Sequence, residues 1–393
     1  MPVLPEAGAV DGAGGLAPGM DRVMLEWERR HPRDGYVIGA LLRLRGRRPT
    51  RERLLAWAAA RVPLVPALAE HLDGPVRRER WTPFGSFDVA SHVHVADGPG
   101  ALSAGEWAVN LPVPADRPRW GLWLLPGSDG EDGYSLVYRV HHAAQDGLAM
   151  VHTLEWLFGA AEPAGTVIPP SCGPGAAEAV VANRVMAVAD VPAAALREIA
   201  REAGCSDHDV YLASLAGALR VWLGAGGCDR PVAVRMPFSV RMPSDRRDRG
   251  NHAGHTRILL PVDEPSAGRR LALVAERTAA WKGRSARKRT RRVQDRMPDR
   301  MLLEEFSAFS DADDSLGTAT SIRFRRPLVF DGDPVTAVTG LPPLHGDHVF
   351  TSVLCVHGTR TTVCFTARAQ DCHVLELAGL WENAVAELAA ARP

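Results

Sequence analysis

The sequence contains almost no lysine. Lys282 and Lys288 are the only two lysines among 46 basic residues, and arginine supplies the others. Asp and Glu also number 46, so the formal net charge at pH 7 is zero. A balanced chain carries no overall field that would draw it to nucleic acid or to an anionic membrane. Broad electrostatic recognition is therefore excluded, and arguments from charge must be local.

Cysteine pairs with metal-ligand spacing and long apolar runs are also missing. The six cysteines are Cys172, Cys205, Cys228, Cys355, Cys364 and Cys372. Because none of them belongs to a CxxC or CxxH pair, we expect no metal site. No run of about 18 apolar residues occurs, and the N-terminus lacks a basic stretch followed by an apolar one. We therefore expect no transmembrane segment or signal peptide, and a cytoplasmic protein with reduced thiols.

The length of 393 residues exceeds what one hydrophobic core usually serves and predicts two lobes. Residues 1–19 are rich in Gly, Ala and Pro and predict a flexible segment. A second stretch dense in Pro and Gly predicts a linker at 161–178. The expected organisation is an N-terminal lobe at 20–160 and a C-terminal lobe at 179–393.

Strand and helix patterns are mixed along the chain, which predicts an α+β fold. Residues 36–46 read as a strand, and 49–62 show apolar residues at helical spacing. The alternating stretch 135–140 predicts a strand that leads into HHAAQDG and then a helix. In the second lobe, Ser206 is the expected N-cap of a long helix. Strands are expected at 231–236 and 256–262, a hairpin at 350–367, and a final helix at 373–390.

The segment HHAAQDG carries the candidate chemistry. It places His141, His142, Asp146 and Gly147 where a strand turns into a helix. A buried neutral imidazole can take a proton from a hydroxyl or an amine that attacks a carbonyl carbon. Asp146 is better placed to hold the backbone, against an arginine from elsewhere, and Gly147 lets the backbone approach closely. An isolated His-His pair, however, is more often hydrogen-bonded packing.

The context of this segment favours the catalytic interpretation. HHAAQDG matches the HHxxxDG signature of the condensation superfamily, and the chain resembles its bacterial wax ester synthase/diacylglycerol acyltransferase branch. Similar elements lie in order along the chain. They are MDRVMLEWE (20–28), FDVASHV (87–93), DRPRWGLWLL (116–125), GCSDHDVYLASLAGALR (204–220), PFSVR (237–241) and GNHAG (250–254).

The resemblance implies two lobes similar to chloramphenicol acetyltransferase, with a substrate tunnel between them. It assigns His142 as the general base, while His141 and Asp146 shape the site and Arg241 is the candidate partner of Asp146. The donor would be an acyl thioester, either acyl-CoA or an acyl carrier protein, and the acceptor a hydroxyl or an amine. No cofactor is implied.

Further residues are candidates for contact with substrate on the same grounds. Gly147 N–H or the Ser239 hydroxyl would stabilise the negative charge on the thioester carbonyl oxygen. His345 and His348 precede a strand of the second lobe and could contact the acceptor. The complete set of predicted substrate-binding residues is Ser239, Arg241, Asn251, Trp123 and His348.

Three functional classes remain open. The first is an ester-forming acyltransferase, the second a condensation-type enzyme that forms an amide from a carrier-bound acyl group, and the third a degenerate scaffold. The sequence departs from the family pattern at Gly121, at His208, which replaces the first residue of an Asn-Asp pair, and at 320–327. With the short chain, these departures predict a specialised enzyme acting in natural-product or lipid metabolism.

The run Lys282–Arg296 carries eight basic residues and one acidic residue. It is a candidate for docking an acyl carrier protein, for contact with the phosphates of coenzyme A, or for adhesion to anionic lipid. A solvated helix is the alternative. Nucleic acid is not expected because aromatic residues do not interleave the run. His92, His94 and His152 are expected to be core or rim residues rather than catalytic ones.

Overall fold

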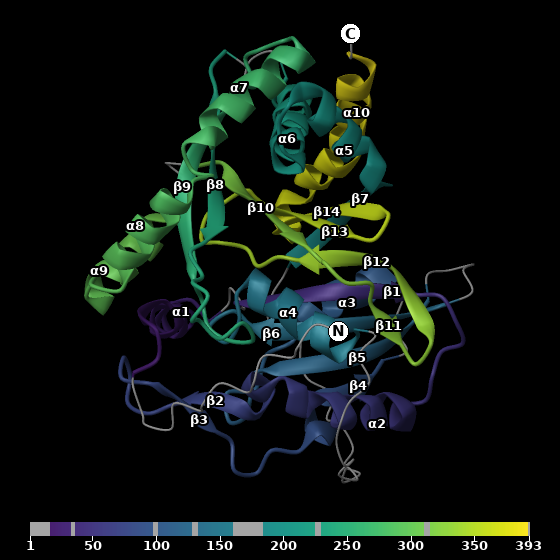
Figure 1. The fold of residues 1–393 in the computed structure, drawn as a ribbon, viewed down its shortest axis with the longest axis vertical. Coiled ribbons are helices and arrows are strands. Elements are labelled where there is room, and N and C mark those ends of the chain that lie inside the picture. Colours follow the sequence, from purple (N-terminus) through teal and green to yellow (C-terminus); the bar gives the residue numbers. More distant parts are fainter. Residues whose placement is uncertain are drawn as a thin grey trace.

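The computed structural model is described over residues 16–32, 36–96, 101–127, 133–159, 184–224, 229–309 and 315–391. These residues form two lobes, each built on a six-stranded mixed sheet with packed helices (Figure 1). The predicted two-lobed α+β fold is confirmed. The predicted linker 161–178 lies outside the described residues, as does most of 1–19. In the described part of the latter, Ala17 is buried, and its N–H donates to Glu79 O over 2.9 Å.

The first sheet has the order β11-β12-β1-β6-β5-β4. Its strands are β1 (Val37–Leu44), β4 (Val93–Val95), β5 (Trp120–Pro126), β6 (Tyr134–His141), β11 (Val329–Phe330) and β12 (Asp333–Leu341). Packed helices are α2 (Arg51–Arg61), α3 (Ala101–Asn110) and α4 (Gly147–Leu157). Every residue of β6 is buried. The strand predicted at 135–140 therefore lies wholly inside the first lobe and leads into the histidine pair.

The second sheet has the order β7-β14-β13-β10-β8-β9. Its strands are β7 (Arg184–Pro192), β8 (Val232–Ser239), β9 (Ala253–Leu260), β10 (Gly317–Arg323), β13 (Phe350–His357) and β14 (Arg360–Arg368). Its helices are α5 (Ala193–Ala203), α6 (Asp207–Leu223), α7 (Ala267–Ala279) and α10 (Leu377–Ala390). Ser206 caps α6 in a capping box with Asp209, as the sequence predicted. The predicted final helix begins as a 3₁₀ segment, Ala369–Glu376.

The two lobes are not separate along the chain. Strands β11 and β12 come from the predicted C-terminal lobe 179–393 but join the first sheet, where β12 pairs antiparallel with β1. Leu341 pairs with Gly39, and apolar residues such as Val338 and Leu341 enter the first core. The predicted division at 161–178 therefore does not separate the sheets, because β1 takes its outer neighbour from distant sequence.

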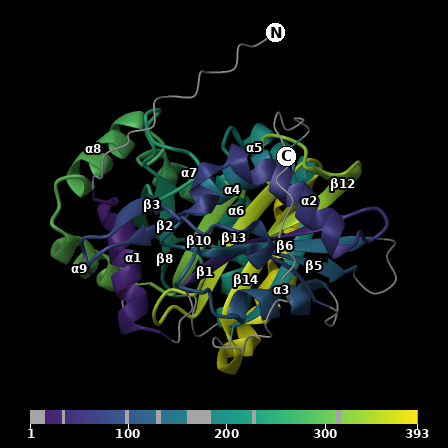
Figure 2. The same cartoon turned by 90° about the horizontal axis from the view of Figure 1, so that it is seen from below.

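A third group of elements lies beside the lobes. Helix α1 (Gly19–Arg30) packs against α9 (Asp299–Phe309), and the hairpin of β2 (Glu70–Asp73) and β3 (Arg80–Pro83) lies close to α1. Figures 1 and 2 show α9 and the basic helix α8 (Arg284–Gln294) standing at the same edge of the molecule as α1. Over the described ranges, no helix combines the length and apolar character needed to cross a membrane.

Trp381 on α10 anchors the second core. Its side chain is fully buried, and its indole N–H donates to Tyr211 O over 3.3 Å. Trp381→Ala should lower the free energy of unfolding by about 3–5 kcal/mol, because it leaves a large cavity between α10 and α6. Denaturant titration followed by circular dichroism measures this change. Val221→Ala, at a side chain 65% exposed on α6, is the control and should change stability by less than about 0.5 kcal/mol.

Candidate active site

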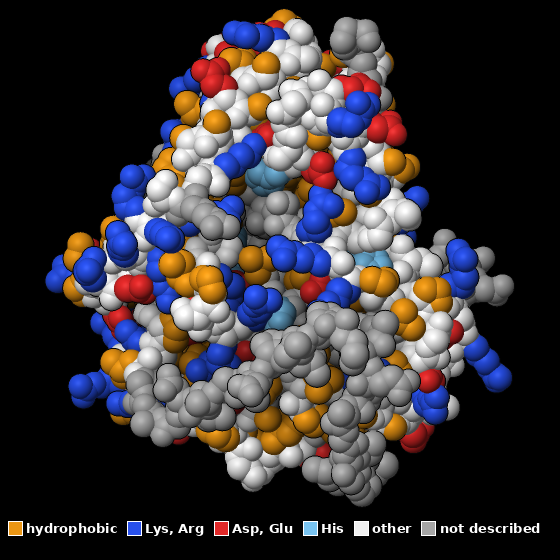
Figure 3. Space-filling view, in the orientation of Figure 1, with side chains coloured by type: hydrophobic (Ala, Val, Ile, Leu, Met, Phe, Trp, Pro, Cys, Tyr) orange, Lys and Arg blue, Asp and Glu red, His pale blue; other side chains and the backbone are white. Residues whose placement is uncertain are grey.

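A cavity of about 500 Å³ lies between the lobes. The first lobe contributes His142 and Gly147 to its wall, while β8 and the segment after β12 contribute Ser239 and His345. Most of the remaining lining is apolar or carries a small hydroxyl group. Figure 3 shows the hollow on one face of the molecule, with histidine side chains inside it and Lys or Arg side chains around its rim. A narrow, largely apolar site with few polar groups is typical of small-molecule binding.

His141 holds the turn at the end of β6 and does not line the cavity. Its ring is fully buried, and its Nδ1 accepts the Ala143 N–H over 3.1 Å. The proton is therefore on Nε2, which lies 3.2 Å from Glu28 Oε1. Burial lowers the pKa of His141 to about 4, so the ring is neutral at pH 7. Burial opposes ionisation of Glu28, but His141 and two hydrogen bonds of 2.7 Å from Arg119 hold its pKa well below the usual range.

His142 lines the cavity, and its tautomer follows from its partner Asn251. The Asn251 Nδ2 group lies 2.6 Å from His142 O and 3.2 Å from Asp21 Oδ1, and both of these atoms only accept hydrogen bonds. The amide oxygen of Asn251 therefore faces His142 Nδ1 at 2.9 Å, and Nδ1 must be the donor. Burial lowers the pKa of His142 below its ordinary value. The ring is thus neutral at pH 7, and Nε2 carries the free lone pair.

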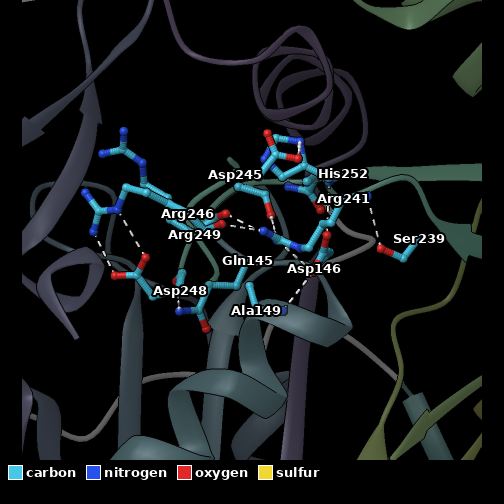
Figure 4. Close-up of polar contacts among 12 residues, drawn as sticks. Gln145, Asp146, Ala149, Ser239, Arg241, Asp245, Arg246, Asp248, Arg249 and His252 are labelled. Atoms are coloured by element: carbon cyan, nitrogen blue, oxygen red, sulfur yellow. Dashed lines mark hydrogen bonds and ion pairs between the residues drawn. The ribbon is translucent and has the colours of Figure 1, made fainter. Parts of the chain in front are cut away.

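Asp146 joins the motif to the second lobe (Figure 4). Its Oδ1 caps α4 by accepting the Ala149 N–H over 2.8 Å, and its Oδ2 accepts the His252 N–H over 3.0 Å. Arg241 Nη2 lies 2.9 Å from Asp146 Oδ1, so these residues form the ion pair for which Arg241 was the candidate. Both carboxylate oxygens are engaged by backbone N–H groups or by Arg241, which suits Asp146 to fixing the backbone rather than to moving protons.

The 240–252 segment, between β8 and β9, is tied to the first lobe by backbone bonds. Arg241 donates to Gly250 O over 2.7 Å and to Arg246 O over 2.6 Å within the segment. Gly250 N–H donates to Ala144 O over 2.6 Å, and Asp146 N–H donates to Gly250 O over 3.2 Å. Arg241 is therefore a structural clamp within this segment and does not line the cavity. That Arg241 also contacts substrate stays a prediction.

Gly147 and Ser239 both line the cavity, as the sequence suggested. A Cβ atom at position 147 would lie 3.3 Å from Ile322 Cγ2 of β10, so the glycine lets the two lobes approach closely. Ser239 Oγ accepts the Arg241 N–H over 3.2 Å. Because this bond uses a lone pair, the hydroxyl hydrogen of Ser239 can be donated into the cavity.

Three of the predicted substrate-binding side chains lie behind the cavity wall. Trp123 belongs to the core of the first lobe, where it stacks on His94 with ring centroids 4.5 Å apart. Asn251 is buried and holds His142 from behind. His348 is fully buried, with Nδ1 3.0 Å from Thr318 Oγ1. Sequence proximity to the motifs did not reveal which face of each strand or turn these side chains occupy.

The neighbouring His345 lines the cavity instead, together with Tyr36, which the sequence analysis missed. The Tyr36 hydroxyl lies 2.9 Å from His345 Nδ1, and its ring stacks on His142 with centroids 5.1 Å apart. Burial lowers the pKa of His345 well below its ordinary value. Tyr36 begins the strand that runs beside β6, and this adjacency to the histidine pair was the available signal.

His92, His94 and His152, which were expected to be core or rim residues, lie outside the cavity lining. His92 Nδ1 lies 2.9 Å from Trp120 O, and Trp156 Nε1–H donates to His152 Nε2 over 3.0 Å. Burial lowers the pKa of His92 and of His94 to about 4. In the described part of the chain, no three His, Cys, Asp or Glu side chains are grouped as metal ligands would be.

The other end of the cavity is basic. Lys282 and Arg287 line it at the start of α8, beside Ser206 and His208 of α6. Lys282 Nζ lies 2.5 Å from Asp209 Oδ2, and Thr278 donates to Oδ1 of the same carboxylate over 2.6 Å. Although burial opposes ionisation of Asp209, these bonds hold its pKa below the ordinary value. The cluster fixes Lys282 at the cavity wall, whereas most of the predicted basic run is exposed on α8.

The sequence was compared with family models and with curated proteins. No family model matches the chain. Among curated proteins, “Putative diacylglycerol O-acyltransferase Rv3087” of Mycobacterium tuberculosis is 24% identical over 252 residues, covering 47% of this chain and 53% of that protein. Rv3371, which has the same descriptive name, is 25% identical over 131 residues, covering 32% and 28%. The chain thus spans about half, or less, of the length of the curated relatives it matches.

Solved structures match over nearly the whole chain. The wax ester synthase/diacylglycerol acyltransferase of Marinobacter aquaeolei VT8 superposes with a TM-score of 0.64 at 16% identity, covering 95% of this chain and 98% of that one. The first condensation domain of the calcium-dependent antibiotic synthetase, with a substrate analogue, gives 0.67 at 19%, covering 96% of each. A starter condensation domain of rhizomide synthetase, in complex with C8-CoA, gives 0.62 at 14%, covering 94% of each. The chain therefore has the condensation-type fold, and its resemblance to the acyltransferase family is confirmed.

Proposed function

We propose that the protein transfers an acyl group from a thioester to a hydroxyl group, with His142 as the general base. One observation carries this proposal. The bond from His142 Nδ1 to Asn251 Oδ1 leaves Nε2 as the proton-accepting nitrogen of a neutral ring at the cavity. The resemblance to diacylglycerol acyltransferases and condensation domains supports the same reaction class. An intact base in a formed cavity argues against a scaffold.

The reaction follows from this geometry. His142 Nε2 takes the proton of the acceptor hydroxyl as its oxygen forms a bond to the thioester carbonyl carbon. The carbonyl π electrons move onto oxygen and give a tetrahedral intermediate. When the carbonyl re-forms, the C–S bond breaks, and the departing sulfur takes the proton from Nε2. The products are an ester and a free thiol, and the imidazole returns to its starting state.

The negative charge on the intermediate requires a donor opposite the base. We assign the Ser239 hydroxyl to this role, because its lone pair is already used by Arg241 N–H and its hydrogen remains available. Gly147 N–H, at the first turn of α4, is the alternative, and the positive end of that helix dipole would assist it.

The charges around the cavity favour a hydroxyl over an amine as acceptor. Among the described lining residues the only carboxylate is Asp146, which Arg241 already pairs. The polar groups near the base are neutral imidazoles, and the rim carries Lys282 and Arg287. An alkylamine is protonated at pH 7 and would meet no counter-charge here. A neutral alcohol enters without this penalty.

The basic end of the cavity is the proposed entrance for the donor. Coenzyme A and a carrier protein both present a phosphate at the end of a pantetheine arm, and Lys282 and Arg287 can contact that group. Further along α8, Lys288, Arg289 and Arg292 are exposed. They form the surface on which an acidic carrier protein would dock.

Replacement of the base tests the proposal directly. His142→Ala should reduce kcat by about 10²- to 10⁴-fold, because general-base catalysis is lost while the surrounding fold keeps its other contacts. Thiol release from a panel of acyl-CoA and acyl-carrier donors with alcohol acceptors measures the rate. Thermal unfolding checks that the variant is folded. Equal acceptor-dependent rates for the two proteins would eliminate His142 as the base.

Asp146→Ala is the matched comparison because it removes a contact that holds the site rather than a reacting group. It should reduce both activity and stability, lowering the free energy of unfolding by about 3–5 kcal/mol, since Arg241 loses its buried partner. Urea unfolding measures the loss. A variant as stable as the wild type would show that the ion pair does not hold the lobes together.

The entrance assignment predicts a change in donor binding. Arg287→Glu should raise the KM for acyl-CoA about tenfold and leave kcat nearly unchanged, because a phosphate contact is replaced by repulsion. Arg292→Glu, on the same helix but outside the cavity lining, is the control. Arg292→Glu should matter only for a carrier-protein donor, whose docking surface would cover more of α8. An unchanged KM in Arg287→Glu would exclude this entrance.

The acceptor assignment is tested with an alcohol and the amine of the same carbon skeleton. At pH 7 the alcohol should have a kcat/KM at least about tenfold higher, since only the small unprotonated fraction of the amine can react. As the pH rises, the kcat/KM for the amine should increase relative to that for the alcohol. Preferred use of the amine at pH 7, with amide as product, would contradict the assignment.

A further inference from the structure

Asp21 is a buried carboxylate that the proposed reaction does not touch. It lies on α1, and its side chain is fully enclosed. Its Oδ1 accepts the Asn251 backbone N–H over 2.7 Å and the Asn251 Nδ2–H over 3.2 Å. Its Oδ2 accepts the indole N–H of Trp81 over 3.0 Å. Three N–H groups from two distant segments therefore converge on one carboxylate directly behind the base.

We propose that Asp21, acting through Asn251, is a positioning residue that sets the orientation and the proton affinity of His142. This inference rests on the proposed role of His142. The contacts run in series from His142 Nδ1–H to Asn251 Oδ1 and from Asn251 Nδ2–H to Asp21 Oδ1. An amide cannot relay a proton here, so no proton moves along this line. Asp21 acts by its charge and by fixing which end of the amide faces the histidine.

The physical effect appears when His142 becomes protonated during transfer. The imidazolium is then a buried cation whose Nδ1–H points at the oxygen of a polarised amide. The Asp21 charge strengthens that amide dipole and supplies a counter-charge at low dielectric. Asp146 also favours the protonated ring of His142, although its carboxylate is paired with Arg241. Among the described residues, no arginine or lysine forms an ion pair with Asp21, and two of its three hydrogen bonds come from Asn251.

Most charged groups on the elements around Asp21 are paired elsewhere. On α1, Arg22 pairs with Asp299 of α9 at 2.5 Å, and Glu28 pairs with Arg119 at 2.7 Å. On the β2–β3 side, Glu79 pairs with Arg29 at 2.5 Å. From the motif and the 240–252 segment, the charged group that acts on Asp21 is Asp146, which is paired with Arg241, while His142 is connected to Asp21 through Asn251. Arg249 lies over the Trp81 ring at 5.4 Å and pairs with Glu70 at 2.5 Å.

The arrangement has a pH signature. Burial raises the pKa of Asp21 to about 6, against the lowering effect of Trp81 and Asn251, and the charge of Asp146 raises it further. Asp21 is therefore ionised above this pH and loses its charge as the pH falls through about 6. Its contribution to the base should be complete at pH 7.5 and nearly absent at pH 5.

Asp21→Asn tests the inference, because it keeps the shape and removes the charge. At pH 7.5 kcat/KM for thiol release should fall about three- to tenfold, as expected for a base whose pKa drops by about one unit. At pH 5 the two proteins should differ by less than about twofold. A loss that is the same at every pH would make Asp21 merely structural and would overturn the proposal.

Trp81→Phe is a second variant, which tests the inference even if Asp21→Asn does not fold. It removes a hydrogen bond that favours the ionised form of Asp21, so the acid limb of the pH profile should move to higher pH while the rate at pH 8 stays within about twofold. An unmoved acid limb would count against the proposal.

A readout independent of activity separates this inference from the proposed function. Nitrogen-15 NMR of the histidine side chains, with His142 assigned from the His142→Ala spectrum, reports its tautomer and its pKa. The wild type should show the Nδ1–H tautomer, and Asp21→Asn should lower the pKa of His142 by about one unit. An unchanged pKa of His142 in Asp21→Asn would overturn the role of Asp21, even if no tested donor and acceptor gave any acyl transfer. If acyl transfer is observed but the pKa of His142 is unchanged in Asp21→Asn, the inference about Asp21 is overturned and the proposed function stands.

Discussion

The ion pair between Asp146 and Arg241 connects the two lobes and holds the segment that contacts the candidate base. Asp146 starts α4 of the first lobe, and Arg241 follows β8 of the second. The same carboxylate receives a backbone N–H from His252, so the whole 240–252 segment is pinned where Asn251 meets His142. A buried pair adds little net stability compared with an apolar one, but it fixes geometry strongly. The orientation of the candidate base thus depends on a contact between lobes.

The sequence predicted those features that arise from local patterns. The strand β6, the turn at HHAAQDG and the Ser206 cap each follow from a few neighbouring residues, and the structure has them. The pairing of Asp146 with an arginine was also foreseeable, because a buried carboxylate needs a partner. The resemblance to a known family then supplied the two-lobed arrangement, which local patterns alone do not specify.

The sequence did not show which face of an element a side chain occupies. Trp123 and His348 lie close in sequence to cavity residues but point into the packed layers behind them. Asn251 was expected to touch substrate, yet it touches His142 and Asp21. The membership of β12 in the first sheet was equally hidden, since its partner β1 lies some three hundred positions earlier. Such facts depend on tertiary register, for which a single sequence offers no periodic signal.

The path of β12 also bears on how the chain reaches this state. Strand β1 pairs with β12 on its outer side. The first sheet therefore stays incomplete during synthesis until the residues near 341 have left the ribosome. Until then an apolar strand edge is open to unwanted pairing with other chains. The lobes consequently cannot fold one after the other as independent domains. Closure of such long-range strand pairs is slow, so the open edge of β1 persists until β12 arrives.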